Sequence, residues 1–114
     1  MEDLLIETLA AFGYPVKLQG SLLENEPYPD SFFTFWNRDS YGNSYYDDDE
    51  KSTVYVYDVN FYSTDPVKVY ETLREAIAAL KNAGFIISGD GYSIASDEPT
   101  HDGRGVEAMF LKAA

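Results

Sequence analysis

The sequence contains no cysteine and a single histidine, His101. Without cysteine there are no disulfides, no thiol nucleophile and no cysteine-ligated zinc site, which is compatible with a reducing cytosol. No apolar run approaches the roughly 20 residues that a membrane span needs. The first residues, MEDLLIETLAAFGYP, begin with acids, whereas a secretory signal begins with basic residues. These absences predict a protein with no membrane segment and no secretory signal.

Basic residues are also scarce, because 8 lysines and arginines face 20 aspartates and glutamates and the net charge is −12. Such a charge argues against binding nucleic acid by neutralising its phosphates. Three interpretations stay open: acidity that only keeps the protein soluble, mimicry of a nucleic acid, or the lining of a passage through which nucleic acid slides without sticking. The aromatic residues cluster in the middle of the chain, where 12 of the 18 lie between Tyr28 and Tyr62.

A length of 114 residues and a hydrophobic fraction of 45% fit one folded domain, residues 1–114. Apolar spacing predicts helices over 1–12 and from Pro66 to the stop at Gly84, with Thr64 or Asp65 as the cap. Strands outnumber helices, so we expect an α+β fold: a mostly antiparallel sheet of about five strands with two helices packed on one face. The strand candidates, of which the first is weak, are 16–22, 31–36, 52–63, 85–88, 92–96 and 106–112.

The strand over 52–63 and the second helix allow side chains to be assigned to faces. On the strand, Tyr57, Val59 and Phe61 share the face expected to be core with Thr53 and Tyr55. The opposite face turns polar at Asp58 and Asn60, so it is predicted to be covered near Val54 and wet beyond. The expected buried stripe of the helix is Val69, Tyr70, Leu73, Ala76, Ile77 and Leu80.

The segment YGNSYYDDDEK, Tyr41 to Lys51, invites a metal or catalytic interpretation, because hard cations prefer clustered oxygens. Its consecutive acids lack the alternating spacing of a calcium loop. Paired carboxylates for glycoside hydrolysis need a cleft, for which a domain of this size has little room. His101 lies in the predicted polar loop DEPTHDGRG, 97–105, with no second histidine and no serine in a nucleophile elbow, so we interpret it as a surface-loop residue. We therefore expect no enzyme activity, no cofactor and no metal site.

An interaction surface explains the same segment better. Tyrosine is favoured at protein interfaces because it offers a large contact area at a low entropy cost. Tyr41, Tyr45 and Tyr46 stand among glycine, asparagine, serine and aspartate, where burial in a monomer is not expected. The acids beside them would keep the free protein from pairing edge to edge. We interpret 37–51 as a loop whose tip contacts another protein.

The residues from about Tyr55 to Lys112 also resemble a known family. They contain a long strand ending in NFYS, a capped helix, AGF, a turn, and DEPTHDGRG leading into a last strand. In these features the chain is similar to small tail-completion proteins of long-tailed bacteriophages and prophages. These are tail terminators or head–tail joining proteins, sometimes called minor capsid proteins. The loop 37–51 also looks like the long hairpin of that family.

The resemblance implies a structural subunit of the virion tail, assembled in the cytoplasm of the bacterial host. It implies a ring of identical copies, commonly six, that caps the tail tube and contacts the tail tube protein and head connector proteins. DNA would pass through the ring without specific binding. Two rivals stay open, an acidic DNA mimic or inhibitor that binds a basic host protein and a calcium-dependent binding module. The candidate interface residues are Tyr41, Tyr45, Tyr46, Asp47, Asp48, Asp49, His101 and Arg104, where Arg104 is expected to pair with an acid of a neighbouring copy.

Overall fold

The computed structural model describes residues 2–18, 29–42, 52–87, 89–94 and 100–113, and within this part it has two helices and six strands. The fold is α+β, as the order of the predicted elements indicates, with one strand more than expected and one parallel strand pair. The elements are α1 (Glu2–Ala10), β1 (Val16–Leu18), β2 (Ser31–Gly42), β3 (Ser52–Ser63), α2 (Pro66–Asn82), β4 (Ile86–Ile87), β5 (Tyr92–Ile94) and β6 (Asp102–Ala113).

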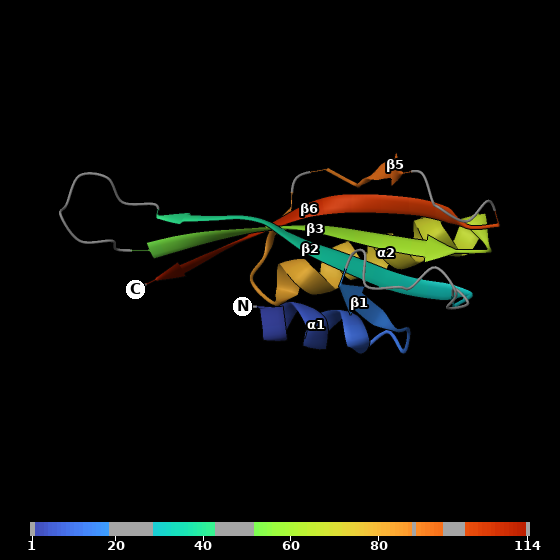
Figure 1. Ribbon diagram of the computed structural model, residues 1–114, viewed down its shortest axis with the longest axis horizontal. Coiled ribbons are helices and arrows are strands. Elements are labelled where there is room, and N and C mark those ends of the chain that lie inside the picture. The colour runs from blue at the N-terminus through green and yellow to red at the C-terminus, as the bar shows by residue number, and fades with distance from the viewer. Residues whose placement is uncertain (1, 19–28, 43–51, 88, 95–99, 114) are drawn as a thin grey trace.

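The sheet is built around three long strands, β2, β3 and β6, with β3 in the middle (Figure 1). Its order is β1-β2-β3-β6-β4, and β5 pairs with β6 as well. The short β1 runs parallel to β2, whereas every other pair is antiparallel. Because β4 and β5 pair with different parts of β6, the long strands are flanked by short ones only over part of their length.

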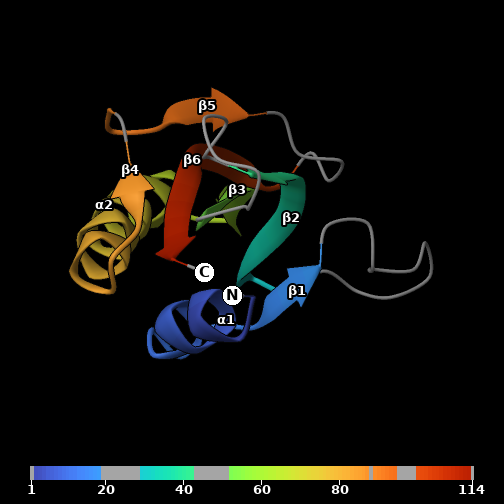
Figure 2. The same cartoon turned by 90° about the vertical axis from the view of Figure 1, so that its left-hand side faces the viewer.

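Both helices pack on one face of the sheet, where they bury its main core (Figure 2). The predicted core face of β3 is confirmed, since Tyr57, Val59 and Phe61 are at most 1% exposed. Leu5 and Leu9 bring α1 into the same cluster. Burial of each large apolar side chain stabilises the fold by about 1.5–3 kcal/mol.

Helix α2 begins and ends where the sequence predicts. The Asp65 carboxylate accepts a hydrogen bond from the Val67 amide at 3.0 Å, and Pro66 occupies the first turn, where its missing N–H costs nothing. Gly84 takes a φ of 108°, which terminates the helix. The predicted buried stripe is wrong at Tyr70, which is 50% exposed, and Thr72 is buried in its place.

The opposite face of the sheet is covered at one end, contrary to the expectation that it is wet beyond Val54. Asn60 is 7% exposed there, and Phe32 is 1% exposed. The Phe32 ring stacks on Tyr62 with centroids 5.3 Å apart and meets His101 edge-on at 6.0 Å. A second, small aromatic cluster therefore packs on the face that carries no helix.

Two strand boundaries differ from the predicted ones by several residues. β2 continues past Trp36 to Gly42, so the predicted loop over 37–51 is wrong for its first six residues. Pairing with β3, whose residues favour strands, extends β2 although residues 37–42 are polar. β6 begins at Asp102, so Arg104 lies in a strand and not in a loop. Pairing with β3 along the whole of β6 supplies backbone hydrogen bonds that local turn propensity did not reveal.

Candidate functional site

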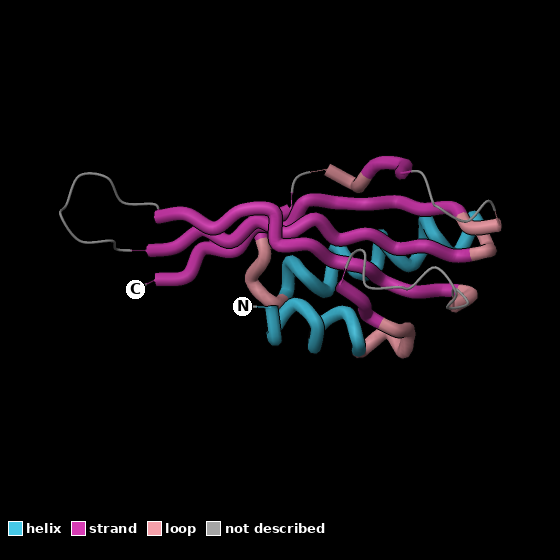
Figure 3. The backbone as a smooth tube through the Cα atoms, in the orientation of Figure 1, coloured by secondary structure: helices cyan, strands magenta, loops and turns pink. Residues whose placement is uncertain are grey.

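β2, β3 and β6 extend beyond both helices as a three-stranded projection (Figure 3). We call Ser40–Gly42, Ser52–Tyr55 and Phe110–Ala113 the ribbon. The molecule is correspondingly elongated, with extents of 51 × 28 × 22 Å. At its base, Tyr55 and Phe110 pack against the main core. Beyond this base no described helix covers the ribbon, so packing on another surface would stabilise it further.

A β-bulge marks the base of the ribbon. Asn37 pairs with Tyr57 and Asp39 pairs with Val56, which leaves Arg38 as the extra residue. The Arg38 guanidinium contacts Asp58 at 3.3 Å and Glu107 at 2.7 Å, so one side chain links all three long strands. Glu107 first and Asp58 second raise the pKa of Arg38 above its usual value. The bulge thus places a cation between two acids that would otherwise repel each other across the strands.

The ribbon has two edges to which no described residue is hydrogen bonded in a ladder. β1 pairs with β2 only as far as Phe35, so among the described residues no strand pairs with the outer side of β2 from Asp39 to Gly42. β4 pairs with β6 only at Ala108 and Met109, so no described strand pairs with Phe110–Ala113 on that side. Unpaired strand edges bind other strands readily. The ribbon therefore offers two distinct sites for β-strand addition.

Large apolar side chains surround the base of the ribbon on the face without helices. Ile86 is 60% exposed and lies opposite Met109, while Leu111 is 48% exposed and lies opposite Val54. Trp36 is 48% exposed and lies across the sheet in line with Asp58 and Glu107, the two acids that bind the Arg38 side chain. A tryptophan and aliphatic residues grouped around an arginine are typical of a protein interface.

Tyr92, on β5, is 49% exposed on the same side. Partial burial is the main cause that raises the pKa of its phenol, and the nearby Asp58 carboxylate adds to the shift. The phenol therefore stays neutral at physiological pH, as a hydrogen-bonding group close to the charged bulge.

Most of the predicted interface residues belong to the segment at the end of the ribbon. Tyr41 lies in β2, in register with Val54. Tyr45, Tyr46, Asp47, Asp48 and Asp49 lie outside the described residues, and their role as contacts stays a prediction.

His101 is 9% exposed, so its interpretation as a surface-loop residue is wrong. Its Nε2 lies 2.8 Å from the Pro29 carbonyl oxygen. Because a carbonyl only accepts, Nε2 carries the hydrogen and donates it. Its Nδ1 lies 3.1 Å from the Thr100 hydroxyl. The imidazole thus links the segment before β6 to the segment before β2, which is a structural role. The role of His101 as a contact with another protein stays a prediction.

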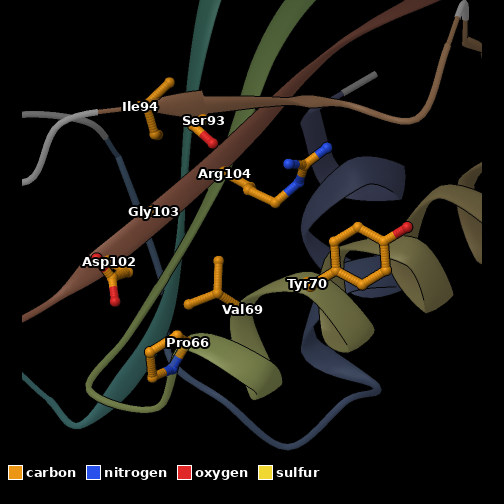
Figure 4. A pocket seen from close by; sticks show the side chains of 8 residues that line it. All are labelled: Pro66, Val69, Tyr70, Ser93, Ile94, Asp102, Gly103 and Arg104. Atoms are coloured by element: carbon orange, nitrogen blue, oxygen red, sulfur yellow. The ribbon is translucent and has the colours of Figure 1, made fainter.

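Arg104 lies on β6, is half-buried and faces the first turns of α2. It lines a hollow of about 360 Å³ (Figure 4). Its Nη2 donates to the carbonyl oxygens of Asp90 and Gly91 at 3.2 and 3.0 Å, and the guanidinium lies 5.2 Å from the centre of the Tyr70 ring. Among the described residues no carboxylate lies within ion-pair distance of it, and its buried Nε–H has no hydrogen-bond partner. Arg104 therefore holds the turn before β5 against α2, and its pairing with a neighbouring copy stays a prediction.

The described part of the chain has neither a cluster of metal ligands nor a membrane-spanning helix. No group of three or more histidine, cysteine, aspartate or glutamate side chains there is placed to hold a metal ion. None of the helices in these ranges has the length and apolarity to cross a membrane. No protein-family model matches the sequence, and no curated protein matches it.

Sequence reasoning missed the residues that organise the base of the ribbon. Arg38 was assigned to a loop, and its link to Asp58 and Glu107 depends on a bulge that no local pattern announces. Glu107 and Asp58 alternate with apolar residues on their strands, which does indicate a shared face. The register that sets these two acids directly opposite each other is a property of the folded sheet.

Proposed function

We propose that this protein is a structural subunit of a bacteriophage or prophage tail, a tail terminator or head–tail joining protein that assembles into a ring on the tail tube. The single observation that carries the proposal is the ribbon, which projects from a compact body with two unpaired edges in the described part of the chain. A free monomer leaves both edges without a strand partner, whereas a subunit of an assembly can pair both of them.

The charge and the resemblance support the same function. A net charge of −12 would repel the phosphate backbone, which suits a ring that DNA passes through without binding. The order of the elements around AGF and DEPTHDGRG is the one that resembles tail-completion proteins. In this proposal the protein works in the virion tail and is assembled in the bacterial host, with the tail tube protein and head connector proteins as its partners.

The proposal is tested by light scattering at high protein concentration, alone and with the tail tube protein of the same virus. We expect a ring of identical copies, formed either alone or on the tube. A single copy under both conditions would contradict the proposal. A tight one-to-one complex with a basic DNA-binding protein would favour the rival function, an acidic DNA mimic.

A further inference from the structure

The two ribbon edges that lack a strand partner in the described part of the chain lie at the same level of the sheet. Val54 in the central strand β3 pairs with Tyr41 on one side and with Leu111 on the other. The next residue, Tyr55, likewise pairs with Ser40 and with Phe110. The free part of β2 and the free part of β6 therefore occupy the same stretch of the ribbon, separated by one strand.

The two edges also run in the same direction. β2 and β6 are both antiparallel to β3, so they are parallel to each other. A rotation about an axis roughly along the ribbon can carry the β6 edge of one copy onto the β2 edge of the next. Because the edges lie at one level and run in one direction, β6 of one copy can lie beside β2 of the next with only the small register offset that strand tilt imposes. Repeating such a rotation about one axis can close the copies into a ring.

We propose that copies of this chain join edge to edge, with β6 of one copy adding in parallel to β2 of the next, so that the ribbons form one continuous closed sheet. The inference rests on the proposed ring assembly and names the contact that forms it. A closed sheet leaves no unpaired edge. Each copy thus pairs its β6 edge with one neighbour and its β2 edge with the other.

The natural lack of cysteine makes the contact testable by disulfide formation. In the variant Tyr41→Cys/Leu111→Cys, the two thiols of one copy flank β3 and their Cα atoms are separated by about two strand spacings, roughly 9–10 Å. That exceeds the limit of about 7 Å for a disulfide, so the bridge can form only between copies. Since strand tilt in a closed sheet offsets the register by a few residues, Tyr41→Cys/Ala113→Cys is made as well.

We expect oxidation of the assembled protein to give a ladder of covalent multimers up to the full ring in at least one of these double variants. The control Leu18→Cys/Leu111→Cys, which places one thiol on the outermost strand β1, should give no ladder.

Rings without a ladder would overturn the edge contact and leave the proposed function standing. A covalent dimer from Leu111→Cys alone would overturn it in favour of a two-fold pair. A ladder without capping of tail tubes would support the contact and contradict the proposed function, and a monomer that forms neither would contradict both.

Discussion

The Tyr62 ring lies directly over Gly103, its partner across the β3–β6 pair. A Cβ atom at position 103 would fall 2.7 Å from two ring carbons of Tyr62 and 2.9 Å from the side chain of Ile94. The missing side chain therefore makes room for the aromatic cluster on the face without helices. This cluster joins the start of β6 to the start of β2 through Phe32 and His101.

Gly103→Ala should destabilise the fold by about 1–3 kcal/mol, because the added methyl group overpacks this site. Urea unfolding measures the loss. In a background of Tyr62→Ala, the same change should cost less, since the ring that it clashes with is gone. An equal cost in both backgrounds would show that Tyr62 does not occupy the space above Gly103.

The cap of α2 gives a prediction with a closely matched control. Asp65→Ala removes the carboxylate that accepts the Val67 amide and should lower the free energy of unfolding by about 1 kcal/mol. Thr64→Ala, one residue earlier on the exposed surface, should leave it within about 0.5 kcal/mol. The two variants are compared by urea unfolding. A larger effect of Thr64→Ala would show that Thr64, and not Asp65, caps the helix.

Much of this architecture could be predicted from the sequence, and the failures share a physical cause. The strands and helices with strong apolar periodicity, such as β3 and α2, were predicted because burial on one face dictates their pattern. The extension of β2 through Arg38 was missed, since pairing with a distant strand outweighed the local turn propensity of polar residues. The burial of His101 was missed for the same reason, because its partner Pro29 is 72 residues away in the chain.

The site was predicted only in outline. The chain around Tyr41 was expected to contact a partner, and the structure places Tyr41 in a strand whose outer side is unpaired among the described residues. The two edges and their common level depend on the register of three strands. The apolar alternation of each strand indicates which face is buried. It does not by itself show which residues of distant strands lie opposite each other.

Alkaline pH should destabilise the protein through Tyr57. Burial in the core, with smaller contributions from Glu2 and Tyr55, raises the pKa of this phenol to about 12. The fold therefore favours the neutral form, and this contribution is complete below pH 10 and is lost as the pH rises through about 12. The loss amounts to roughly 2–3 kcal/mol, since each pKa unit corresponds to about 1.4 kcal/mol.

Unfolding free energies measured between pH 9 and 12 test this prediction. In Tyr57→Phe the fall with pH should be clearly shallower than in the wild type, because the buried ionisable group is gone. Identical slopes in the two proteins would assign the alkaline loss to other groups.

Arg38 should control the order of the ribbon more than the stability of the whole fold. Its ion pairs with Asp58 and Glu107 are exposed, so their loss has little effect on global unfolding. Arg38→Met should instead speed amide hydrogen exchange several-fold in the ribbon, because the two acids then repel each other at its base. Arg74→Met, on the exposed side of α2, should leave ribbon exchange unchanged. Equal exchange in both variants would show that the bulge does not fasten the ribbon.

Electron microscopy of tail tubes assembled with and without this protein tests its proposed role most directly. The account predicts short tubes that each carry, at one end, a closed ring of this protein coaxial with the tube. Tubes of unchanged length with bare ends would contradict it.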